Sequence, residues 1–172
     1  MKKKLKIKSG VEIQIKKGIP AGFGMGSSAG SAAATAVAFG KLFKIKLNSN
    51  QLVEFAGFGE KASAGTIHYD NVAASVLGGF VIVKTNPLNV ISIDPPTNLR
   101  MCVAVPKIDV PKKKTKVSRG VIPKNIKLTD AILNLSNASA IVAGFMNKDS
   151  ELIGNSIKDV IVEPARQHMI PG

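Results

Sequence analysis

The stretch P-A-G-F-G-M-G-S-S-A-G-S-A-A-A, residues 20–34, decides how this chain folds. Glycines at positions 18, 22, 24 and 26 let the backbone adopt positive φ and approach a ligand closely. Ser27 and Ser28 follow directly and open an alanine-rich segment, which predicts a helix start. N–H groups of a glycine loop, continued by the positive end of a helix dipole, are typical of a phosphate site. The alternative is a glycine-rich hairpin ahead of an ordinary core helix.

The spacing of the loop excludes two better-known phosphate-binding motifs. A Walker A loop requires Lys-Ser or Lys-Thr directly after its last glycine, whereas two serines follow Gly26. The dinucleotide fingerprint also fails, because counting from Gly22 or Gly24 puts its third glycine at Ser27 or Ala29. Any phosphate site here is therefore of another type.

Composition and charge limit the class of protein. The 172 residues suffice for one good core or two small ones. The formal charge of +13 implies attraction to anions, such as nucleotides, nucleic acid or an acidic membrane surface. The excess lysines cluster at residues 2–8 and 112–116. Lysine runs are more often solvated faces than binding sites, and no RNP-type or zinc motif supports nucleic-acid binding.

The single cysteine and the N-terminus indicate the compartment. Cys102 lies in an apolar run and has no second cysteine to pair with, which predicts a buried thiol in a reducing cytosol. Residues 5–17 alternate in polarity instead of forming a continuous apolar block, so they do not read as a signal peptide. No segment reaches transmembrane length. We therefore expect a cytoplasmic protein with no membrane partner.

A strand and a helix are predicted on either side of the glycine loop. Val11, Ile13 and Ile15 alternate with polar residues, the period of a half-buried strand. The helix is predicted over residues 27–43, and its small residues allow close packing. These small residues are Ala29, Ala32, Ala33, Ala36 and Gly40.

A second helix is predicted to contain an inward-facing carboxylate. Asn48 and Gln51 resemble a capping box, and the helix should run to about Ala64. Glu60 lies one turn beyond Ala56, on the same side as the apolar stripe. Burying a carboxylate without compensation costs several kcal/mol. Glu60 is therefore either a partly solvated residue at a frayed helix end or a metal ligand.

Residues 65–79 contain three polar residues of interest, His68, Asp70 and Asn71. For each alone, an ordinary turn with Asp70 as a helix N-cap is the favoured interpretation. Three polar residues shortly after an inward-facing Glu60 favour a functional cluster instead.

The remaining chain predicts further elements joined by a proline linker. In order they are paired strands at 80–84 and 90–93 around a turn at 86–89, a linker at 94–98, a buried strand at 99–105, a basic loop or short helix at 112–119, helices at about 129–146 and 150–160, and a final stretch, residues 163–172, with no structural element.

Three stretches together resemble the GHMP kinase superfamily, and within it the homoserine kinase family, especially archaeal forms. They are the glycine loop, H-Y-D-N-V-A-A-S-V-L-G-G-F at residues 68–80, and E-P-A-R-Q-H-M-I-P-G at residues 163–172. The first is shared with galactokinases and mevalonate kinases. The second and third select homoserine kinases, and the resemblance extends over essentially the whole chain.

The resemblance implies an α+β GHMP kinase fold in two parts. Residues 1–97 would be the remainder of the N-terminal, ATP-binding domain, which is ribosomal protein S5 domain 2-like in the family. Residues 98–172 would be the first part of the C-terminal, ferredoxin-like domain. Strands of the family fold would then be missing, leaving exposed sheet edges, for which association, such as a homodimer, is an expected consequence.

The resemblance also implies a role for each site residue. The phosphates of ATP would be held by Pro20, Gly22, Gly24, Met25, Gly26, Ser27 and Ser28. Ser28 and Glu60 would ligate Mg²⁺, and Asn71 would lie near the transferred phosphoryl group, completing the catalytic set. The contacts with homoserine would come from His68, Asp70, Arg119 and Arg166. The two arginines suit the amino-acid carboxylate because a guanidinium binds it in bidentate fashion.

The expected reaction transfers the γ-phosphoryl group of ATP to the side-chain hydroxyl of L-homoserine, giving O-phospho-L-homoserine for threonine synthesis. The sequence offers no strong general base, in agreement with catalysis by positioning and charge neutralisation. The family's N-terminal Pro-x-Ser-x-Asn and C-terminal Gly-Ser-Gly-Pro-Ser motifs are absent, so we expect this chain alone to be a weak or inactive kinase. The alternatives are another GHMP small-molecule kinase and a basic nucleic-acid-binding module that uses the lysine runs.

Overall fold

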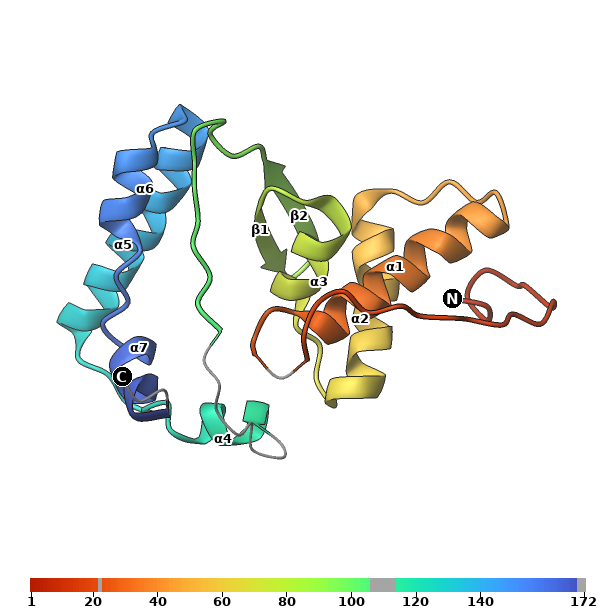
Figure 1. Ribbon diagram of the computed structural model, residues 1–172, viewed down its shortest axis with the longest axis horizontal. Helices are drawn as coiled ribbons and strands as arrows, with labels where there is room; N and C mark the ends of the chain where they lie inside the picture. Colours follow the sequence, from red (N-terminus) through yellow and green to blue (C-terminus); the bar gives the residue numbers. More distant parts are fainter. Residues whose placement is uncertain (22, 106–113, 170–172) are drawn as a thin grey trace. The chain divides into compact units, whose positions relative to one another are not determined.

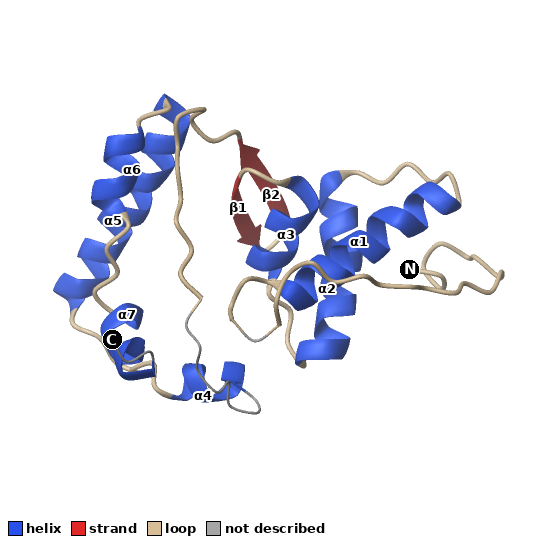
Figure 2. Ribbon diagram, in the orientation of Figure 1, coloured by secondary structure: helices blue, strands red, loops and turns tan. Residues whose placement is uncertain are grey.

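The computed structural model describes residues 1–21, 23–105 and 114–169, and the chain divides into two compact units, Met1–Asp94 and Pro95–Gly172 (Figure 1). Helices predominate, and the described residues form one two-stranded antiparallel sheet (Figure 2). The α+β character predicted from the sequence is thereby confirmed. None of the helices in these three ranges is both long and apolar enough to span a bilayer.

The first unit consists of three helices and a hairpin. Its elements are α1 (Ser27–Leu42), α2 (Ser49–Ala64), α3 (Tyr69–Leu77), β1 (Phe80–Thr85) and β2 (Leu88–Ile93). Helices α1, α2 and α3 pack on one another, and α3 also contacts β1. The buried core is largely small and aliphatic. It comprises Ala29, Ala33, Ala36, Val53, Phe55, Ala56, Val72 and Ala73.

Local signals in the sequence set the position and spacing of α1 and α2. The predicted capping box is present, because Asn48 Oδ1 accepts from the Gln51 N–H at 2.9 Å and Gln51 Oε1 accepts from the Asn48 N–H at 3.0 Å. Small residues permit the close helix contact predicted for α1. A Cβ atom at Gly59 would lie only 3.2 Å from the Cβ of Ala32, so α1 and α2 approach closely at this pair.

The predicted hairpin is also confirmed. Strands β1 and β2 pair with Phe80 opposite Ile93 and Thr85 opposite Leu88, across a turn with a cis Asn86–Pro87 bond. Gly79 precedes β1 at φ 69°, and a Cβ atom there would lie 2.7 Å from the Ile93 carbonyl oxygen. A side chain at this position would therefore disturb the end of the hairpin.

The second unit is helical in the part that the structure describes. Its elements are α4 (Lys114–Gly120), α5 (Leu128–Asn147), α6 (Ser150–Ser156), α7 (Val162–Arg166) and the 3₁₀ helix η1 (Gln167–Met169). A tight turn joins α5 to α6, with Lys148 left-handed at φ 58°. Asp149 caps α6 through a 2.9 Å bond from the Leu152 N–H.

Asn134 attaches the segment after α6 to α5. Its Nδ2 donates to Asp159 Oδ1 at 2.8 Å, and its Oδ1 accepts from the Val160 N–H at 3.0 Å. Asp159 also accepts from the N–H groups of Ile161 and Val162. Such side-chain bonds compete with helix formation, which explains why α6 ends at Ser156 and not near residue 160 as predicted.

Several other predictions were wrong. Neither residues 11–15 nor residues 99–105 form a strand, since no described strand pairs with them. The second of these segments is solvated rather than buried, with Met101 84% and Val103 66% exposed, and Cys102 is likewise exposed. The stretch 163–169, predicted to contain no structural element, carries most of α7 and all of η1.

Candidate active site

The glycine loop enters α1 through left-handed backbone. Gly24 has φ 76° and Gly26, the N-cap of α1, has φ 69°, a backbone conformation that favours glycine at both positions. The Ser27 hydroxyl donates to the Ile19 carbonyl at 2.8 Å and ties the loop's two ends together. Gly22 lies outside the described residues. No described residue of the loop belongs to a strand. This geometry favours the phosphate-loop interpretation over a hairpin.

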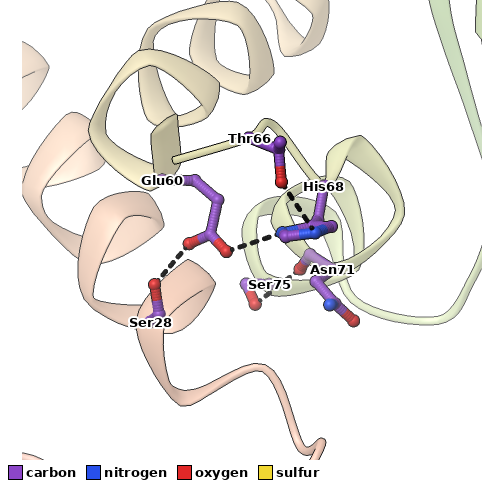
Figure 3. A network of polar contacts seen from close by, with 6 residues as sticks. All are labelled: Ser28, Glu60, Thr66, His68, Asn71 and Ser75. Carbon is purple, nitrogen blue, oxygen red and sulfur yellow. Dashed lines mark hydrogen bonds and ion pairs between the residues drawn. The ribbon is translucent and has the colours of Figure 1, made fainter. Parts of the chain in front are cut away.

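Glu60 is the buried charge at the centre of the site. Only 4% of the residue is exposed, so the solvated helix-end alternative is wrong. Its Oε2 accepts from the Ser28 hydroxyl at 2.6 Å, and its Oε1 lies 3.0 Å from His68 Nδ1 (Figure 3). Among the described residues, no buried side-chain nitrogen or oxygen lacks a hydrogen-bond partner. The carboxylate is thus compensated by two neighbours from different elements.

The helix contact explains why Ser28 and Glu60 meet. Ala32 and Gly59 approach closely, as described above. Ser28 lies one turn before Ala32 on α1, and Glu60 directly follows Gly59 on α2. The close approach of the two backbones therefore brings the first turn of α1 next to the C-terminal part of α2.

Helix α3 contributes the polar residues predicted from H-Y-D-N. His68 is its N-cap, so the interpretation of Asp70 as the cap was wrong; Asp70 is exposed in the first turn. Asn71 lies against the glycine loop, because a Cβ atom at Gly26 would be 3.7 Å from Asn71 Cβ. The Ser75 hydroxyl donates to the Asn71 carbonyl at 2.8 Å. The fold therefore brings together the glycine loop, Ser28, Glu60 and Asn71 (Figure 3).

The donors present fit a Mg²⁺ ion that is shared with a phosphate ligand. No cluster of three or more His, Cys, Asp or Glu side chains in the described ranges could hold a metal alone. Mg²⁺ commonly takes one or two protein oxygens and completes its octahedron with water and substrate phosphates. Adjacent oxygens in that octahedron are about 2.9 Å apart. The 2.6 Å between Ser28 Oγ and Glu60 Oε2 is close to this separation.

Arg119 and Arg166 lie near each other in sequence-distant parts of the second unit. Arg166 Nε donates to the carbonyl of Ser118, the residue before Arg119, at 2.9 Å. Arg119 is exposed in α4 and Arg166 is half-buried at the end of α7. Their joint role at a homoserine carboxylate stays a prediction, as does the contribution of Asp70 from the first unit.

Two features near the loop were missed by sequence reasoning. Thr66 Oγ1 lies 3.2 Å from His68 Nε2, a contact that no spacing rule indicates. A groove in the first unit also runs beside Ser28, between the N-terminal segment and the helices α1 and α2. Lysines and apolar side chains line it, among them Lys17, Ile13 and Phe58. The alternation at residues 11–15 marks the apolar side of this groove.

Comparison with known proteins gives a consistent result. Residues 1–79 match the family model of the GHMP kinases N terminal domain. Homoserine kinase of Methanococcus maripaludis is 40% identical over 97% of this chain, and that of Thermoplasma volcanium is 39% identical over 96%. The chain is similar to homoserine kinases over nearly its whole length. It covers 53% and 54% of the Thermoplasma and Methanococcus proteins, so it spans about half the length of the curated relatives it matches.

A solved homoserine kinase has the same fold over most of the chain. The crystal structure of homoserine kinase from Cytophaga hutchinsonii matches with a TM-score of 0.75 and 38% identity. The match covers 90% of this chain and 49% of the solved chain. The GHMP kinase fold predicted from the motifs is therefore confirmed, although residues 11–15 and 99–105 form no strand here.

Proposed function

We propose that this chain takes part in the ATP-dependent phosphorylation of the side-chain hydroxyl of L-homoserine, giving O-phospho-L-homoserine for threonine biosynthesis. One observation carries the proposal. The hydroxyl of Ser28 and the buried carboxylate of Glu60 lie 2.6 Å apart where the glycine loop enters α1. The similarity to homoserine kinases over nearly the whole chain supports the choice of substrate.

The loop and the first turn of α1 would bind the phosphates of ATP. Positive φ at Gly24 and Gly26 turns the backbone into the helix N-terminus, whose N–H groups and dipole favour an anion. Pro20, Met25 and Ser27 belong to the same loop, and the Ser27 bond to Ile19 keeps it closed. Ser28 and Glu60 would hold Mg²⁺. The chemistry that such an ion would supply there is neutralisation of the negative charge that develops during phosphoryl transfer.

Residues of α3 and of the second unit would position the acceptor. Asn71, packed against Gly26, would orient the homoserine hydroxyl and the phosphoryl group. The exposed carboxylate of Asp70 suits the substrate ammonium. Arg119 and Arg166 would bind the substrate carboxylate, for which a bidentate guanidinium is suited.

The transfer forms a bond between the homoserine oxygen and the γ-phosphorus and breaks the bond from that phosphorus to the β–γ bridging oxygen. The hydroxyl proton passes to a phosphoryl oxygen or to water as the ester forms, and ADP leaves with the bridging oxygen. Phosphoryl transfer of this kind depends on positioning and charge neutralisation, so the chain needs no strong base. Each oriented N–H group of the loop and each metal contact would contribute a few kcal/mol.

We also infer the finer fold that the relatives imply, an S5 domain 2-like part over residues 1–97 and a ferredoxin-like part over residues 98–172. The family match over residues 1–79 supports the first part. We further expect a cytoplasmic location and a homodimer. Gel filtration of the purified chain tests whether it forms a homodimer.

Binding and turnover test the proposed function separately. Calorimetry on the full chain should detect MgATP binding, which Ser28→Ala and Glu60→Gln weaken. Phosphorus NMR then follows O-phospho-L-homoserine formation, for which we expect slow or no turnover by this chain. Arg166→Ala should lose homoserine binding and keep ATP binding. Wild-type MgATP affinity in both Ser28→Ala and Glu60→Gln would refute the site, and turnover of another alcohol but not homoserine would favour another GHMP kinase.

A further inference from the structure

His68 contacts the candidate metal ligand Glu60, and both of its ring nitrogens already have a hydrogen-bonding neighbour. Nδ1 lies 3.0 Å from Glu60 Oε1 and Nε2 lies 3.2 Å from Thr66 Oγ1 (Figure 3). The His68 side chain is mostly buried, with 14% exposed. A hydrogen bond from either nitrogen to homoserine would first have to break one of these contacts.

The contact with Glu60 determines that Nδ1 of His68 carries a hydrogen. A carboxylate only accepts hydrogen bonds, so the nitrogen that faces Glu60 carries a hydrogen. In a neutral imidazole the other nitrogen is then an acceptor, which the Thr66 hydroxyl can satisfy as donor. Glu60 therefore selects a ring with a hydrogen on Nδ1, and the Thr66 hydroxyl is compatible with that form.

The backbone between α2 and α3 is built to hold this contact. Helix α2 ends at the left-handed Gly65, and His68 follows three residues later as the N-cap of α3 without using its side chain for capping. Cβ addition at Gly57 would meet Tyr69 Cε1 at 2.8 Å and Ile67 Cγ2 at 3.0 Å. The two residues that flank His68 thus pack directly on α2, three residues before Glu60.

We propose that His68 is a positioning residue for Glu60 and that the Thr66 contact helps to hold the His68 ring in place. The proposal rests on the proposed function, in which Glu60 is a Mg²⁺ ligand. His68 occupies Oε1 and thereby turns Oε2 towards Ser28, where the metal would bind. Groups that orient a metal ligand in this way typically change metal affinity or activity by about 10- to 100-fold when they are removed.

Metal affinity of the full chain tests the proposal. Mn²⁺ serves as the probe, measured by electron paramagnetic resonance with and without ADP. His68→Leu should weaken ADP-dependent Mn²⁺ binding about 10- to 100-fold, and Thr66→Val should weaken it less. His68→Asn should restore most of the affinity, because an asparagine amide can place its N–H near the position of Nδ1. His68→Gln, whose amide reaches the Nε2 position instead, should not. Circular dichroism checks that each variant is folded.

Wild-type Mn²⁺ affinity in His68→Leu and Thr66→Val, together with a loss in Glu60→Gln, would overturn the positioning role and leave the proposed metal site intact. If Glu60→Gln also keeps wild-type affinity, the proposed metal site falls. Nitrogen-15 NMR of His68 then tests the contact between His68 and Glu60 independently of metal binding. Protonation of Nδ1 in the neutral ring supports it, and protonation of Nε2 alone overturns it. A homoserine contact of His68 predicts that His68→Leu weakens homoserine binding, measured by calorimetry, and leaves Mn²⁺ affinity unchanged.

Discussion

The Ser28 hydroxyl donates to the Glu60 carboxylate at 2.6 Å, although the two residues are 32 positions apart in the chain. Glu60 lies just before the last turn of α2, near the helix end whose dipole disfavours a negative charge. The contact places the same carboxylate beside the first turn of α1, where the dipole favours it. The position of Glu60 is therefore explained by the neighbouring helix and not by its own.

We expect Glu60→Gln to separate metal binding from folding. A glutamine amide can accept from His68 and donate to the Ser28 oxygen, so the loss of folding free energy should be about 1 kcal/mol. The charge that a divalent cation needs is removed, so MgATP affinity should fall by at least tenfold. Chemical denaturation and calorimetry measure the two quantities.

Glu54→Gln is the matched control on the same helix. Glu54 pairs with Lys4 at 2.8 Å near the surface, and exposed pairs contribute about 0–1 kcal/mol. This variant should keep wild-type MgATP affinity. Equal losses of affinity in the two variants would mean that net charge, and not the site, controls binding.

The helices could be predicted from the sequence because their signals are local. Asn48 and Gln51 mark the start of α2 through bonds that the chain makes within one turn. The inward position of Glu60 followed from helical periodicity in the same way. Its partner Ser28 was assigned only through the resemblance to a family, since no local rule connects two helices.

The false strands show where periodicity fails. Alternation at Val11, Ile13 and Ile15 indicates one apolar side, which here lines a groove against α1 and α2. A strand also requires a neighbour that pairs with its backbone, and alternation carries no information about that neighbour. The Thr66–His68 contact was missed for a related reason, because it depends on how the turn between two helices closes.

A second prediction concerns the loop. Gly26→Ala should destabilise the chain by about 1–2 kcal/mol, because alanine in left-handed backbone is strained. Space is not the cause, since the nearest atom to an added Cβ is 3.7 Å away. If the loop relaxes out of this conformation, ATP affinity should fall about 5- to 30-fold. Thermal denaturation and nucleotide titration measure both effects.

Gly30→Ala provides the contrast four residues further along. Gly30 lies inside α1, and an added Cβ would make an ordinary contact, 3.4 Å from Ile19 Cδ1. Replacing a helix-internal glycine should stabilise by about 0.5–1 kcal/mol and leave ATP affinity unchanged. Stabilisation by both substitutions would show that Gly26 is not held in left-handed backbone.

A third prediction concerns the turn between α5 and α6. An added Cβ at Gly144 would lie 2.8 Å from Ile153 Cγ1 and 3.1 Å from the Ile153 nitrogen. Because the second of these is a backbone atom, Gly144→Ala should destabilise the second unit by about 1–3 kcal/mol. At Gly154, in α6, nothing lies within 4 Å, so Gly154→Ala should be tolerated. Hydrogen exchange of residues 128–156 compares the two, and equal protection would contradict the packing described.

The last prediction concerns how the folding stability of the second unit changes at acidic pH. Burial alone raises the pKa of the Asp159 carboxyl, but hydrogen bonds from the Val162 N–H, the Asn134 amide and the Ile161 N–H outweigh burial and hold the pKa below its ordinary value of 3.8. A carboxyl with a lowered pKa stabilises the folded state above its unfolded pKa, and this contribution is lost as the pH falls through the folded pKa. The stability advantage of wild type over Asp159→Asn should therefore be present at neutral pH and shrink below about pH 3.8.

Carbon-13 NMR titration measures the pKa of the Asp159 carboxyl directly. Asn134→Ala, which removes one donor, should move the Asp159 midpoint upward. Asn137→Ala is the control. Asn137 lies on the same face of α5 and donates to the Lys158 carbonyl at 2.8 Å, so this variant removes a neighbouring hydrogen bond but no donor to Asp159. An Asp159 midpoint that Asn134→Ala leaves unchanged would contradict this explanation of how the segment after α6 is held.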